Sequence, residues 1–88
     1  MKIIKPETNN GNEKRTLVYD EMSKKYFIVS SINNAFGNET YIFESDSDGN
    51  ITNWSEVWGT RPSKHSRVVD MLVSGEISYL DLDISDEE

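Results

Sequence analysis

The only histidine in the sequence is the side chain best suited to acid–base chemistry near neutral pH. His65 stands beside Ser63 and Ser66, so a serine–histidine pair, in which the imidazole activates a hydroxyl nucleophile, is the chemistry to consider. These residues fall in the first turn of an expected helix, where adjacent positions do not face each other. The flanking residues also lack the strand–turn–helix context of a nucleophile elbow. We therefore expect His65 to be an exposed helix residue and the protein not to be an enzyme.

A cluster of carboxylates stands in a segment that contains no apolar side chain. Glu44, Asp46 and Asp48 have the spacing of positions 1, 3 and 5 of a calcium-binding loop. Position 12 of such a loop would be Ser55 in place of a bidentate glutamate, and the preceding segment has the composition of a strand instead of a helix. We therefore expect an acidic hairpin turn that reverses at Gly49, with no metal and no cofactor.

Three basic side chains surround the start of the expected helix. They are Arg61, Lys64 and Arg67. Together they could hold a phosphate, because the helix dipole favours anions at a helix N-terminus. The alternative, which the large excess of acids favours, is that these residues pair with carboxylates of the same chain.

One segment of the chain resembles a known group of proteins. Residues 37 to 56 read G-x-E-T-x-x-F-x-x-D-x-x-G-x-I-x-N-W-x-E. This pattern is similar to a segment of small proteins that are encoded by tailed bacteriophages and prophages and whose function is unassigned. The resemblance therefore implies a phage-type accessory protein and assigns no functional residue. Trp54 lies in this segment and Trp58 follows it; both are expected to seat the acidic turn on the sheet and are candidate binding residues.

Length and composition limit the possible classes of protein. The chain has 88 residues, so we expect one domain with a small core. Cysteine is absent, which excludes disulfides and thiolate metal sites. Apolar runs are too short to span a bilayer, and the first residues are too polar for a secretory signal. We therefore expect a soluble protein of the cytoplasm, the host cytoplasm if a phage encodes it.

The charge distribution suggests the kind of partner. The net charge is −7, and the stretch from residue 68 to 88 carries acids and no bases, including the candidate binding residues Asp81 and Asp83. An acidic surface repels phosphate backbones, so we expect no direct nucleic-acid binding and a protein partner with a basic surface. Three alternatives remain open: the charge only confers solubility, the acids mimic DNA toward a nucleic-acid-binding defence protein as anti-restriction and anti-CRISPR proteins do, or the protein binds metal or is an enzyme.

The remaining patterns predict a sheet. Short β-branched and aromatic runs, separated by turn residues, are typical of strands. Such runs occupy residues 2–4, 16–19, 26–32, 40–43, 51–54 and 77–84. Both alternating sets of residues in the third run are largely apolar, which predicts a central strand covered on both faces; a strand covered on one face is the alternative. We expect a flexible loop at residues 6–14, a short helical turn around Val57 and Trp58, and an acidic tail at residues 85–88.

A single helix is expected between residues 63 and 74. Val68, Val69 and Leu72 recur at helical spacing, and Ser63 is suited to the N-cap. Gly75 is suited to the left-handed conformation that ends a helix. A run of strands that precedes one amphipathic helix predicts an α+β fold. The expected architecture is an antiparallel β-sheet of about five or six strands with the helix packed on one face.

Overall fold

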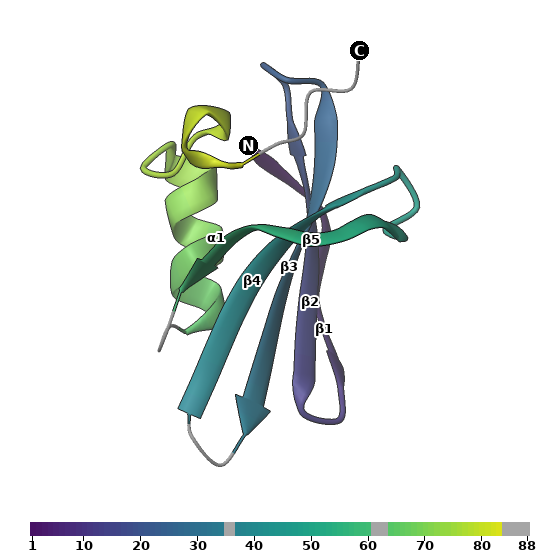
Figure 1. The fold of residues 1–88 in the computed structure, drawn as a ribbon, viewed down its shortest axis with the longest axis vertical. Coiled ribbons are helices and arrows are strands. Elements are labelled where there is room, and N and C mark those ends of the chain that lie inside the picture. The colour runs from purple at the N-terminus through teal and green to yellow at the C-terminus, as the bar shows by residue number, and fades with distance from the viewer. Residues whose placement is uncertain (35–36, 61–63, 84–88) are drawn as a thin grey trace.

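Consecutive strands form one antiparallel sheet in the computed structural model, which describes residues 1–34, 37–60 and 64–83 (Figure 1). Each strand pairs with the next along the chain, so the order across the five-stranded sheet is β1-β2-β3-β4-β5. The strands are β1 (Lys2–Asn10), β2 (Glu13–Asp20), β3 (Lys25–Asn34), β4 (Gly37–Ser45) and β5 (Ile51–Thr60). Within the described residues a helix, α1 (His65–Ser74), and a short 3-10 helix, η1 (Tyr79–Asp81), follow the sheet. The predicted α+β fold is therefore confirmed.

The central strand, β3, is covered on both faces, as its sequence predicts. Successive side chains of a strand point to opposite faces of the sheet. Phe27 and Val29 belong to the core beneath α1, whereas Ile28 points to the other face, and all three side chains are buried. The sheet therefore has a helix-covered face and a second face, which we call the open face.

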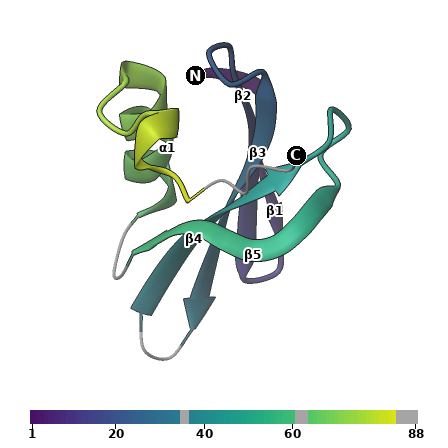
Figure 2. The same cartoon turned by 45° about the horizontal axis from the view of Figure 1, so that its top comes forward.

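The helix α1 lies across one face of the sheet (Figures 1 and 2). Its buried apolar side chains, Val68, Val69 and Leu72, join side chains from the strands in one hydrophobic cluster. Gly75 ends the helix in the left-handed conformation with φ +88°, as predicted. The predicted N-cap, Ser63, lies outside the described residues, and the helix proper begins at His65.

The expected flexible loop at residues 6–14 is wrong, because these residues form the end of β1, the turn and the start of β2. β1 continues past Pro6, and the chain turns at Gly11, where φ is +67°. The predicted strand at residues 2–4 is the start of β1, but the strand is exposed along its whole length, and beyond Ile4 its composition carries no strand signal. Proline is tolerated because the strand lies at the edge of the sheet, where a missing N–H donor need not break the ladder. The register of β1 with β2 shifts between Ile3 and Thr8, so the pairing is irregular around this proline.

The expected helical turn around Val57 and Trp58 is also wrong, because both residues continue β5. In the register of β4 with β5, Ile42 pairs with Trp58 and Glu44 pairs with Asn53. Between these two pairs the chain advances by two residues in β4 but by five in β5. Such an insertion bends a strand. This irregularity allows Val57 and Trp58 both to pack against the core.

The predicted C-terminal strand at residues 77–84 is replaced by η1. The Asp81 carboxylate accepts a hydrogen bond from the Ser78 backbone N–H at 2.9 Å, and the Ser78 hydroxyl accepts one from the Leu80 N–H at 3.3 Å. This capping box starts the 3-10 helix and leaves Leu80 exposed. Leu82 is buried in the core, and the Asp83 N–H donates to the Val57 carbonyl of β5 at 2.9 Å. Ile84 and the acidic tail lie outside the described residues.

Candidate functional site

Three aromatic side chains form a row on the open face of the sheet. Ile42 of β4 lies in the core beneath α1, so its neighbours Tyr41 and Phe43 point to the opposite face. The ring centroids of Tyr41 and Phe43 are 6.2 Å apart, and those of Phe43 and Trp54 are 5.7 Å apart. Trp54 remains 69% exposed despite this contact. We call Tyr41, Phe43 and Trp54 the aromatic row.

Carboxylates flank the aromatic row. The Tyr41 hydroxyl donates a hydrogen bond to the Glu39 carboxylate at 2.8 Å. This hydrogen bond raises the pKa of Tyr41, with smaller contributions from burial and from the negative charges of Glu39 and Glu56. Flat aromatic faces beside carboxylates are the surroundings in which arginine and lysine side chains bind, by cation–π contact together with ion pairing.

The acidic turn between β4 and β5 uses its central carboxylate to hold its own backbone. Asp46 accepts hydrogen bonds from the backbone N–H groups of Asp48 and Asn50, both at 2.9 Å, and from the Asn50 amide at 3.2 Å. These bonds, with those from Asn50 largest, lower the pKa of Asp46. Glu44 forms an ion pair with Lys25 at 3.4 Å. In the described ranges, no group of three or more histidine or acidic side chains is arranged to hold a metal ion.

The same turn folds against the open face of the sheet. The Lys5 ammonium of β1 donates to the Asp48 carbonyl at 3.1 Å. Gly49 has φ +92°, and a Cβ atom built on it would lie 3.8 Å from the side chains of Leu17 and Ile28. The turn therefore shields these two buried residues, and the expected reversal at Gly49 is confirmed.

Replacing Gly49 by valine is expected to destabilise the protein by about 1 kcal/mol or more. The cause is the backbone, because a β-branched residue is strained at positive φ whereas the 3.8 Å contacts leave room for a Cβ atom. Urea denaturation of both proteins would measure the difference. Gly49→Asn is the matched control, since asparagine tolerates positive φ better and should lose less stability. Equal stability of the valine variant and the wild type would contradict this account of the turn.

The structure separates the other predicted binding residues. Trp58 is partly buried and packs against the core, so it does not extend the aromatic row. Asp81 caps η1, and Asp83 is exposed beside β5. The acidic turn and η1 lie at opposite sides of the molecule in both views (Figures 1 and 2). The candidate acids therefore do not form one continuous surface.

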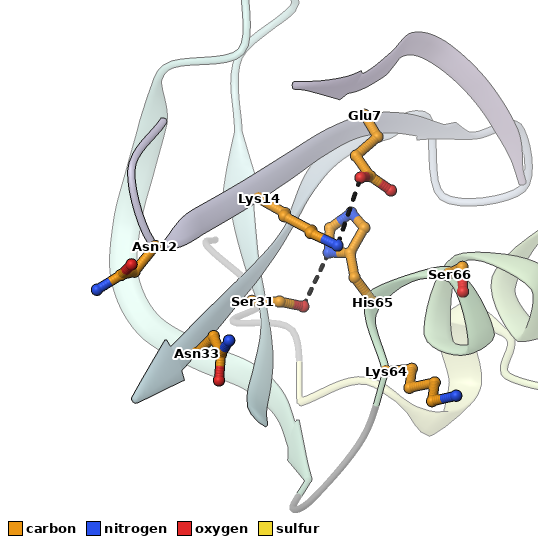
Figure 3. Close-up of a pocket in the computed structure, with 8 residues that line it drawn as sticks. All are labelled: Glu7, Asn12, Lys14, Ser31, Asn33, Lys64, His65 and Ser66. Carbon is orange, nitrogen blue, oxygen red and sulfur yellow. Dashed lines mark hydrogen bonds and ion pairs between the residues drawn. The ribbon is translucent and has the colours of Figure 1, made fainter. Parts of the chain in front are cut away.

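The predicted basic cluster is also divided. Lys64 lines a cavity at the start of α1, and its ammonium points away from His65 (Figure 3). Arg67 is exposed on α1, and Arg61 lies outside the described residues. A lysine of β2, Lys14, extends toward the imidazole instead (Figure 3).

His65 is buried between α1 and the sheet, so the expectation of an exposed helix residue is wrong. Its side chain is 5% exposed. The Nε2 atom lies 2.7 Å from Thr16 Oγ1 of β2, and the Nδ1 atom lies 2.8 Å from Ser31 Oγ of β3. Ser31 Oγ is in turn 2.7 Å from Thr40 Oγ1 of β4. The imidazole thus connects hydroxyl groups from neighbouring strands beneath the helix.

The surroundings of His65 favour the neutral imidazole. Burial is the largest effect and lowers the pKa of His65; the Glu7 carboxylate raises it, and the Lys14 ammonium lowers it further. Glu7 and Lys14 form an ion pair at 3.7 Å. These residues, His65 and Ser31 line a cavity of about 290 Å³ beside the start of α1 (Figure 3). A neutral imidazole in contact with a serine hydroxyl is able to act as a general base.

The sequence pattern does not reveal this cluster, because its members are far apart in the chain. Ser31 and Thr16 precede His65 by 34 and 49 residues. The signal in the sequence is that Thr16 and Ser31 are hydroxyl residues within otherwise apolar strands. Because successive side chains of a strand point to opposite faces, both fall on the helix-covered face.

Comparisons of the chain with protein-family models, with curated proteins and with solved structures found no match. A search for membrane spans found that α1 and η1, the helices of the described residues, are too short or too polar to cross a bilayer. Function must therefore be inferred from the aromatic row and from the His65 cluster themselves.

Proposed function

We propose that this protein acts by non-catalytic binding of a protein partner that presents a basic surface to the aromatic row. The observation that carries the proposal is Trp54, which is 69% exposed at the end of a row of contacting aromatic rings. In accord with the resemblance of residues 37 to 56, we infer a phage-type accessory protein that modulates a protein of the host.

The aromatic row has the composition of a binding hot spot. Tryptophan and tyrosine are enriched among the residues that dominate protein–protein affinity. Their rings bury a large area at a small cost in side-chain entropy. Phe43 supports the Trp54 ring from one side, so that the exposed tryptophan is already positioned before a partner binds. A partner therefore gains contact area without first ordering a mobile side chain.

Electrostatics favour a basic partner. The chain carries a net charge of −7, which accelerates association with positively charged proteins. Glu39 is hydrogen-bonded to Tyr41, and Glu56 lies close enough for its charge to raise the pKa of Tyr41. An arginine or lysine of the partner would thus meet an aromatic face and a carboxylate together.

The alternative role as a DNA mimic gains less support. It requires the acids near residues 44–48 to act with Asp81 and Asp83 as a continuous negative surface. These groups lie at opposite sides of the molecule, and Asp46 and Glu44 are engaged in bonds within the fold. The aromatic row therefore offers the better basis for binding.

Trp54→Ala is expected to reduce retention of the partner at least tenfold, because it removes the highly exposed tryptophan ring of the aromatic row. The measurement is capture from a bacterial lysate on immobilised wild-type and variant protein at moderate salt. Met22→Ala is the matched control: Met22 is 74% exposed but lies in the β2–β3 turn, away from the aromatic row, so its removal should leave capture unchanged. Capture should also weaken as salt is raised.

Two results would change the proposal. Capture of the same proteins by the wild type and by Trp54→Ala would contradict binding through the aromatic row. Displacement of the captured protein by double-stranded DNA, with no effect of Trp54→Ala, would favour the DNA-mimic alternative instead.

A further inference from the structure

We propose that Ser31 is a nucleophile, activated by His65, that reacts with small activated acyl compounds entering the cavity beside the start of α1. This site lies on the helix-covered face of the sheet, whereas the aromatic row lies on the open face. The activity is therefore additional to the proposed binding function and does not depend on it.

The hydrogen bonds of the imidazole allow Nδ1 to act as the base toward Ser31, in one of the two tautomers of the ring. A neutral imidazole has one N–H donor and one acceptor nitrogen. When the Thr16 hydroxyl accepts from Nε2–H at 2.7 Å, the lone pair of Nδ1 faces Ser31 Oγ at 2.8 Å. Ser31 then donates its proton to Nδ1. Nucleophile, base and orienting group thus follow the same order as in hydrolases with an activated serine, with the hydroxyl of the positioning residue Thr16 in place of a carboxylate.

The charged groups around the dyad suit a reaction that develops negative charge. Burial keeps His65 neutral and available as a base near pH 7, since its pKa is lowered. Lys14 is paired directly with Ser31 in the register of β2 and β3. Its ammonium forms an ion pair with Glu7 at 3.7 Å and is close enough to His65 to lower the pKa of the imidazole. A cation at this position would stabilise the oxyanion of a tetrahedral intermediate.

The cavity limits the substrate to small molecules. Ser31 is only 6% exposed, but it lines the cavity of about 290 Å³ together with His65. This volume is at the lower end of ligand pockets in proteins. A short acyl group fits, whereas a long lipid or a folded polypeptide does not.

The reaction needs no reagent other than water. Ser31 Oγ forms a bond to the acyl carbon while its proton passes to Nδ1 of His65. The imidazolium then gives this proton to the leaving alcohol as the acyl C–O bond breaks. Water attacks the acyl-serine in the same manner, its proton passing through Nδ1 to Ser31 Oγ, and a carboxylic acid is released.

The test uses two probes on the purified full chain: a fluorophosphonate, which labels activated serines, and p-nitrophenyl acetate, a small activated ester. Intact mass and peptide mapping are expected to find one covalent adduct, on Ser31, and the labelling rate should rise with pH as His65 loses its proton. Ser31→Ala should abolish the adduct, and His65→Gln should slow labelling at least a hundredfold, the effect of losing a general base. Ser74→Ala is the matched control, because Ser74 is an exposed serine at the other end of α1 and should label like the wild type.

Absence of an adduct on Ser31 in the folded wild type would overturn the proposal, as would equal labelling rates of wild type and His65→Gln. Circular dichroism establishes that each variant is folded. If His65→Gln does not fold, Thr16→Val decides the question: it removes the orienting hydroxyl at nearly constant volume and should slow labelling severalfold. An unchanged rate in that variant would count equally against the proposed dyad.

Discussion

Replacing Leu72 by alanine is expected to lower the free energy of unfolding by about 2 to 5 kcal/mol. Leu72 is fully buried in the cluster that joins α1 to the sheet. Truncation removes apolar contacts and leaves a cavity that a closely packed interior closes only in part. A domain of this size has a small core, so the loss should be a large fraction of its total stability.

The next residue of α1 supplies the control for this experiment. Val73 is 46% exposed, so Val73→Ala should change the free energy of unfolding by no more than about 0.5 kcal/mol. Both variants make one apolar side chain of the same helix smaller, and urea denaturation measures both on the same scale. Similar small losses for the two variants would mean that α1 does not pack on the sheet through the face that contains Leu72.

The sequence predicts those elements whose pattern is set by burial. β3 was predicted because apolar residues occupy both of its faces, and α1 because its apolar residues recur at helical spacing. Only residues 2–4 of β1 were predicted as a strand, because β1 is exposed at every position and the composition of its remainder resembles that of a loop. η1 was mistaken for a strand because Leu80, Asp81 and Leu82 alternate in polarity as they would in one. The Ser78 and Asp81 capping box was the local signal that distinguishes the two structures.

The two tryptophans show why the candidate site is harder to predict than the fold. In a regular strand, residues four apart point to the same face, so Trp54 and Trp58 would lie together. The insertion in β5 separates them: Trp58 pairs with Ile42 on the helix-covered face, and Trp54 contacts Phe43 on the open face. Such an irregularity depends on tertiary packing and has no short sequence signature. The partners of His65 likewise depend on strand register, which links residues distant in the chain.

The free energy of unfolding is expected to fall as the pH decreases below about 6.5, the ordinary pKa of histidine. Burial lowers the pKa of His65 in the folded protein, so the unfolded chain binds a proton at a higher pH than the folded chain. The contribution of the neutral imidazole to the free energy of unfolding is therefore fully present above about pH 6.5. It is lost as the pH falls toward the pKa of His65 in the folded protein. For a single proton the slope is at most about 1.4 kcal/mol per pH unit.

Charged groups from each element around His65 modify this effect. Glu7 of β1 favours the protonated imidazole, whereas Lys14 of β2 opposes it. β3 contributes the uncharged Ser31, and α1 places Lys64 and Asp70 around the adjoining cavities. Because burial is the largest of these effects, the net direction is a loss of stability on protonation.

Urea denaturation of the wild type and of His65→Gln at intervals between pH 5.5 and 7 would test this prediction. The chain contains one histidine, so the variant should show a nearly constant free energy of unfolding across that range. Glu13 and Asp46 also have lowered pKa values in the folded protein, but the unfolded carboxyl groups take up protons only below about pH 5, so their contribution falls outside the window. Parallel pH dependence of the two proteins would show that His65 is not held neutral by burial, and would remove the physical basis for its role as a base toward Ser31.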